Sequence, residues 1–163
     1  MRSGILWEKK DKNINDSIDD KSRVGSIWDH TAIDSESRLV ISTVIGKRTE
    51  AETMELLEDV SHRCNKRDPS HSSGFAPNKI RTDDYSAYKK AIIKTYGYEV
   101  ISDDPAENGT YFEPYGTVYT AIKKTRKNGR IVDIDREIKI GLEYINYKGL
   151  DKNEYLDNAF TNV

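Results

Sequence analysis

One dipeptide, Asn128-Gly129, constrains the fold of this chain more than any other feature. It lies between two runs with strand character, residues 117–127 and 130–140. Asn-Gly is the preferred sequence for the tight turn of a two-residue hairpin, because both positions need a positive φ. Apolar residues alternate with charged ones along the second run: Val132, Ile134, Ile138 and Ile140. The sequence therefore predicts a long antiparallel hairpin with one buried and one solvated face.

A second hairpin and a helix are predicted nearer the N-terminus. Residues 27–34 and 38–46 both have strand character, and a short polar turn joins them. The second of these strands is almost continuously β-branched, which is typical of a strand buried on both faces. Thr49-Glu50-Ala51-Glu52 matches a capping box, so a helix is expected to follow. Its apolar stripe consists of Met54, Leu57, Val60 and Cys64.

Two adjacent carboxylates, Asp83 and Asp84, follow the short strand-like run Lys79-Ile80-Arg81-Thr82. A helix is predicted directly after them, over residues 85–96. A carboxylate at the carboxyl end of a strand is a common place for chemistry, because the strand fixes it and the loop leaves it open to solvent. The alternative is that one of the two aspartates only caps the helix. The local pattern leaves both readings open.

The predicted order is hairpin, helix, strand, helix and second hairpin. This order predicts an α/β (α+β) fold, in which a mixed sheet has helices packed on it. It is compatible with a ribonuclease-H-like fold that carries an inserted β-hairpin, although periodicity alone does not select this fold over other mixed α/β folds. Four segments result: a strand remnant and charged loop at 1–26, the core at 27–100, an inserted loop and hairpin at 101–141, and a C-terminal tail at 142–163.

The charge balance limits the partners. With 163 residues the chain is long enough for one domain, and 26 Lys and Arg face 28 Asp and Glu, so any nucleic-acid binding must use a local patch. One such patch surrounds the tip of the second hairpin: Lys123, Lys124, Arg126, Lys127 and Arg130. These side chains can bind phosphates, or they can simply be the solvated side chains of an exposed loop.

The single cysteine excludes an internal disulfide, and no apolar run reaches the length of a membrane span. A soluble cytoplasmic protein is therefore expected.

Several segments, taken together, resemble DDE transposases of the family typified by insertion sequence 1. The resemblance covers about residues 8–163 in order and spacing. It is carried by Asp29-His30-Thr31-Ala32-Ile33-Asp34-Ser35-Glu36-Ser37-Arg38-Leu39-Val40, by Val44-Ile45-Gly46-Lys47-Arg48-Thr49 and by Thr82-Asp83-Asp84-Tyr85-Ser86-Ala87-Tyr88. In that family a ribonuclease-H-like core uses three carboxylates to hold two Mg²⁺ or Mn²⁺ ions. These ions support DNA cleavage and strand transfer between transposon ends and target.

The resemblance implies a catalytic, metal-binding role for Asp83, which matches the second of the three carboxylates. Asp84 stands where the family often has glycine or an aromatic residue, and Asp34 matches a recurrent aspartate that is not catalytic. The first catalytic aspartate would lie at about Met1 or before it, and the glutamate just beyond Val163. The resemblance therefore implies a core truncated at both ends and inactive by itself, because a lone carboxylate holds Mg²⁺ poorly.

Two other hypotheses come from different classes of function. The chain could be a non-enzymatic nucleic-acid-binding or assembly module that uses the basic hairpin tip. It could also be a mixed α/β domain without such a role, whose clipped first strand leaves an unpaired sheet edge that favours self-association. The residues Asp29, Asp34 and Asp84 remain open as substitutes for the missing carboxylates.

Overall fold

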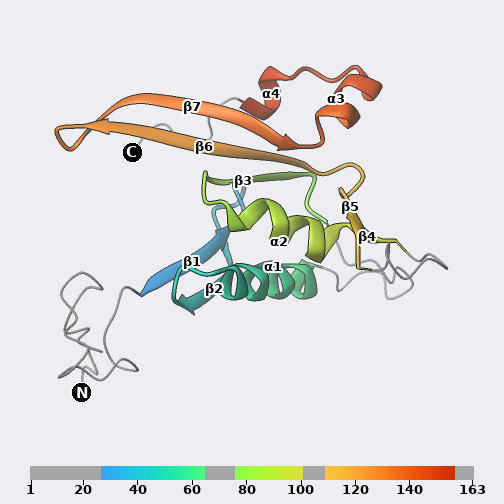
Figure 1. Ribbon diagram of the computed structural model, residues 1–163, viewed down its shortest axis with the longest axis horizontal. Coiled ribbons are helices and arrows are strands. Elements are labelled where there is room, and N and C mark those ends of the chain that lie inside the picture. Colours follow the sequence, from blue (N-terminus) through green and yellow to red (C-terminus); the bar gives the residue numbers. More distant parts are fainter. Residues whose placement is uncertain (1–26, 65–75, 101–108, 157–163) are drawn as a thin grey trace.

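The computed structural model describes residues 27–64, 76–100 and 109–156 (Figure 1). The predictions for 1–26, for most of the loop at 65–78 and for 101–108 and 157–163 fall outside these residues. The described part is a mixed α+β structure. Its elements in chain order are β1 (Trp28–Ile33), β2 (Val40–Gly46), α1 (Glu50–Cys64), β3 (Lys79–Asp83), α2 (Ala87–Tyr96), β4 (Tyr98–Glu99), β5 (Tyr111–Phe112), β6 (Val118–Lys127), β7 (Arg130–Ile140), α3 (Leu142–Lys148) and α4 (Asn153–Leu156).

The first hairpin forms as predicted, with β1 and β2 antiparallel and Trp28 opposite Gly46. Its turn is fixed by Asp34, whose carboxylate accepts hydrogen bonds from the backbone N–H groups of Glu36 and Ser37. The prediction that β2 is buried on both faces is wrong, because Ile45 is largely exposed. The β-branched run fits a pleated strand with only one covered face just as well, and that face packs against α1.

The second hairpin is confirmed, with β6 and β7 at Val118–Lys127 and Arg130–Ile140. Asn128 and Gly129 have φ values of 52° and 77°, as its tight turn requires. The hairpin joins β3 in a three-stranded sheet of order β3-β6-β7, in which β3 runs parallel to β6. The expectation of one mixed sheet needs correction, because β1 and β2 form a separate sheet. Among the described residues β3 is an edge strand rather than a central one.

The core lies between the three-stranded sheet and two helices. In Figure 1, α2 packs below the sheet and α1 lies below α2. Its buried residues come from both helices and from the sheet: Leu57, Ala91, Ile92, Tyr96, Tyr119, Ala121 and Ile140. The Tyr96 hydroxyl donates a 2.9 Å hydrogen bond to the Leu57 carbonyl oxygen, which ties α2 to α1, and burial raises the pKa of Tyr96.

Residues 142–163 were predicted to be a weakly patterned tail, but this segment contains α3 and α4, of 7 and 4 residues. Helices this short show no periodic apolar stripe, so hydrophobic spacing could not reveal them. They lie on the side of the sheet opposite to α2 (Figure 1). Thr120 on β6 donates a hydrogen bond to the carbonyl oxygen of Tyr155, which holds α4 on that face. Among the described residues, no helix combines the length and apolar character needed to cross a membrane.

Candidate functional site

Asp83 is the last residue of β3 and its side chain is 59% exposed. The parallel strand β6 runs beside it, with Ile122 as its register partner. The residue that caps α2 is Ser86, without a side-chain hydrogen bond. The capping interpretation of Asp83 and Asp84 is therefore wrong, and both carboxylates stay available for other contacts.

The partner of Asp83 is Arg48, in the turn between β2 and α1. Its guanidinium donates a hydrogen bond to the Asp83 carboxylate and forms an ion pair with it. The same guanidinium lies 5.0 Å from the ring centroid of Trp28 and 4.5 Å from that of Tyr85. The Tyr85 hydroxyl donates a 2.7 Å hydrogen bond to the Arg48 carbonyl oxygen. This cluster joins the β1–β2 hairpin to the end of β3, and cation–π contact with two rings fixes the guanidinium.

Asp84 forms an ion pair with a different cation. Its carboxylate lies 3.6 Å from the Nζ atom of Lys139 on β7, and Lys139 also donates a hydrogen bond to Glu137. The hydrogen bond to Glu137 raises the pKa of Lys139, so its ammonium remains protonated at neutral pH. The two neighbouring carboxylates are thus held by separate cations rather than directed at one point.

Two tyrosines close to this strand end are neutral. The Tyr119 hydroxyl lies 2.9 Å from the Thr82 hydroxyl, and burial raises the pKa of Tyr119. Burial also raises the pKa of Tyr88 on α2. Their phenols remain protonated hydrogen-bonding groups, which do not act as anionic ligands.

The described residues do not form a Mg²⁺ site by themselves. They contain no group of three His, Cys, Asp or Glu side chains placed to hold a metal. Mg²⁺ needs several converging oxygen ligands, and here Asp83 offers one carboxylate that Arg48 already binds. Asp34 is not a substitute, because its turn uses its carboxylate at the far end of β1.

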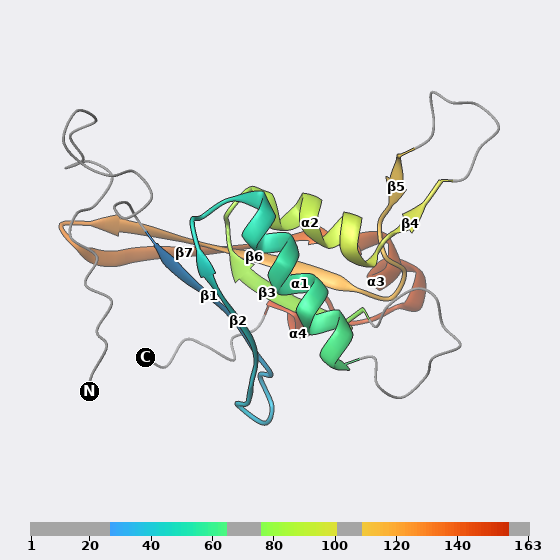
Figure 2. The same cartoon turned by 90° about the horizontal axis from the view of Figure 1, so that it is seen from below.

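The five basic residues predicted at the hairpin tip are all exposed. They lie on the part of the hairpin that continues past the end of β3, because β3 pairs with β6 only from Val118 to Ile122. Figure 1 and Figure 2 both show this part as an arm projecting from the body of the protein. An open hollow of about 430 Å³ at its tip is lined by Lys127, Asn128, Arg130 and Val132.

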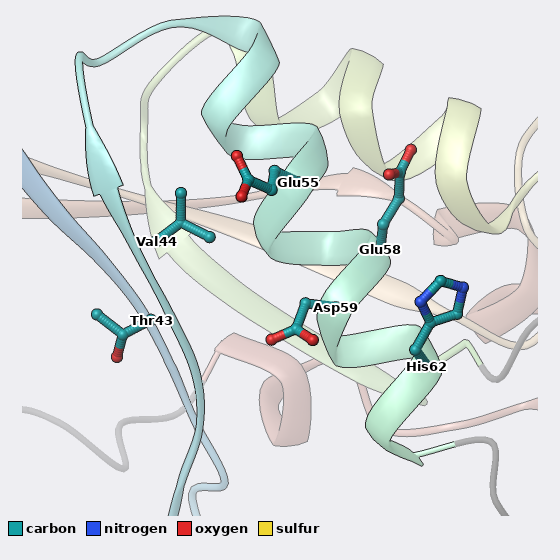
Figure 3. A pocket seen from close by; sticks show the side chains of 6 residues that line it. All are labelled: Thr43, Val44, Glu55, Glu58, Asp59 and His62. Atoms are coloured by element: carbon teal, nitrogen blue, oxygen red, sulfur yellow. The ribbon is translucent and has the colours of Figure 1, made fainter.

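A second hollow, of about 310 Å³, lies between β2 and α1 (Figure 3). Its acidic residues are Glu55, Glu58 and Asp59, all on α1. Asp59 accepts a 2.5 Å hydrogen bond from Ser42 and a 2.7 Å one from Arg63, and the bond from Ser42 lowers the pKa of Asp59. In Figure 3 Asp59 points toward β2, whereas Glu58 lies on the opposite side of the helix. Asp59 is therefore bound within the fold by Ser42 and Arg63, and Glu58 does not share its side of the helix.

Comparisons with models of protein families, with curated proteins and with solved structures found no match. Two features of the structure remain as candidates for function: Asp83 at the end of β3, and the basic arm. The residues of both were singled out from the sequence. No role was predicted from the sequence for Arg48, Trp28 or Lys139. The one available signal was the position of Arg48 in the short turn between a predicted strand and a predicted helix.

Proposed function

We propose that this chain is part of the catalytic core of a DDE-type transposase, which moves an insertion sequence by metal-dependent DNA cleavage and strand transfer. The observation that carries the proposal is the position of Asp83. It presents an exposed carboxylate at the carboxyl end of a strand, next to a parallel neighbour and before a helix. Open sheets commonly place their chemistry at this edge.

The order of elements supports the same proposal. The β1–β2 hairpin, α1, β3, α2 and β6 occur in this order, with the two-residue strands β4 and β5 between α2 and β6. Strand β6 runs parallel to β3, and both helices lie on one side of their sheet. This order is compatible with a ribonuclease-H-like core. Asp83 would then be one ligand of a site that other carboxylates complete, and Arg48 would hold it in place before a metal binds.

Paramagnetic broadening by Mn²⁺ in NMR spectra tests the role of Asp83. We expect Mn²⁺ to broaden the amide signals of residues 82–85 selectively, because the exposed Asp83 carboxylate attracts the ion weakly. Asp83→Asn should abolish this broadening. Arg48→Gln should cause it at a lower Mn²⁺ concentration, because it removes the competing cation.

Asp84→Asn is the matched control, since it removes the neighbouring charge and should leave most of the broadening in place. Broadening that survives in Asp83→Asn, or that centres elsewhere, would contradict the proposal. The chain assayed alone should not nick supercoiled plasmid with Mg²⁺, because among the described residues no other carboxylates converge with Asp83 on a metal. Nicking that Asp83→Asn abolished would show that the chain is active without the others.

A second candidate function is a non-enzymatic nucleic-acid-binding module, which the basic arm favours. Five cationic side chains project on a narrow hairpin beyond the body of the protein. If they bind phosphates, immobilised protein should retain plasmid DNA at low salt and release it as the salt concentration rises. A chain that retains no DNA at low salt would eliminate this candidate.

A further inference from the structure

The charged residues of the arm lie on two different faces of the hairpin. Residues directly opposite in an antiparallel pair have side chains on the same face, and successive residues alternate between faces. Lys124 is opposite Ile134, and Arg126 is opposite Ile131. Thr120 lies on the same face and contacts Tyr155, so we call it the α4-side face. Within the arm this face has two cations and two isoleucines, and no carboxylate.

The other face of the arm has a mixed composition. It continues the face on which Tyr119 and Ala121 pack in the core against α2, so we call it the α2-side face. Lys123 is opposite Asp135 there, and Thr125 is opposite Asp133. Lys127 and Arg130 add two cations near the turn. Carboxylates directly opposite or beside these cations weaken the attraction of this face for an anion.

The arm has a length and width that suit the major groove of DNA. From Lys123 to Lys127 it extends about 17 Å beyond β3, at about 3.4 Å a residue. A two-stranded ribbon fits the major groove of B-form DNA. At the base of the sheet the α4-side face is covered, because Lys79 stacks on Tyr155 and Arg81 bonds to the Glu154 carbonyl oxygen. The arm continues this face beyond the end of β3.

We propose that the arm binds duplex DNA through its α4-side face, with Lys124 and Arg126 on the phosphates of the groove and Ile131 and Ile134 toward its interior. This proposal rests on the nucleic-acid binding proposed above, and it names the kind of nucleic acid and the surface. Exposed cations beside apolar residues also suit an anionic membrane surface. Duplex DNA is the better partner because the ribbon is narrow enough to enter a groove and its α4-side face carries two cations without a carboxylate.

Two double variants that each remove two positive charges test which face of the arm binds DNA. Lys124→Gln with Arg126→Gln removes two cations from the α4-side face, and Lys123→Gln with Lys127→Gln removes two from the α2-side face. The full chain is titrated against a short fluorescein-labelled duplex by anisotropy at several salt concentrations. The first variant should lose about tenfold or more in affinity and about 1.8 in salt slope, as expected for two phosphate contacts. The second should lose less than about threefold, since long-range attraction alone then changes.

Each other result overturns the proposal in a distinct way. Equal losses in the two variants would refute the face but leave DNA binding standing. Unchanged affinity in both would place the DNA away from the arm, and absence of duplex binding in the unaltered chain would remove nucleic-acid binding as well. Tighter binding to phosphatidylserine vesicles, or to the single strand of the same sequence, would assign the arm to that partner instead. Circular dichroism establishes that both variants are folded.

Discussion

Ile92→Ala is expected to lower the free energy of unfolding by about 2–5 kcal/mol, the range for a large buried aliphatic side chain cut to alanine. Ile92 has no exposed surface and lies in the cluster that joins α2 to the sheet. The truncation loses the transfer free energy of three methyl or methylene carbons and leaves a cavity. Urea unfolding followed by circular dichroism measures the change.

Ile93→Ala is the matched control. It is the same substitution one position along α2, where the side chain is only partly buried at the edge of the core. The loss should be clearly smaller than at Ile92, because less apolar area leaves water in the folded protein. Equal losses at the two positions would show that α2 does not pack on the sheet as described.

The long hairpin could be predicted from the sequence because its signals are local. The Asn-Gly turn and the alternation of apolar and charged residues predict its turn and its two strands without reference to the rest of the chain, whereas the two shifts of register, at Tyr119/Thr120 and at Thr125/Arg126, have no such signal. The strand that ends at Asp83 was also predictable, because a helical pattern begins shortly after it. By contrast, β4 and β5 have two residues each and contain no pattern that could be detected.

The contacts of the site could not be predicted, because they are tertiary. Arg48 and Asp83 are 35 residues apart and meet through the packing of α1 on α2. The same limit applies to Lys139, which reaches Asp84 from β7. The basic residues were predicted as one patch, whereas the register divides them between two faces. A pattern of charges shows how many cations a segment carries, but the pairing of strands decides which of them face the same way.

Gly141→Ala is expected to destabilise the protein by about 2–5 kcal/mol, from two costs. Gly141 has a φ of 85°, where an L-residue with a side chain is strained. A Cβ atom there would also lie 2.4 Å from the carbonyl oxygen of Thr117, a backbone atom that cannot move aside easily. That contact brings the end of β7 against the start of β6, so the substitution acts on the sheet that supports the arm.

Gly149→Ala separates the two costs, because Gly149 also has a positive φ, of 63°, but no atom lies within 4 Å of its added Cβ. It should cost only the conformational strain, about 1–2 kcal/mol. Thermal and urea unfolding of both variants measure the difference, which reports the close approach of β7 to β6. If the two substitutions cost the same, the backbone at Gly141 does not lie against Thr117. The register that divides the cations of the arm between its faces would then lack its anchor at the base of the sheet.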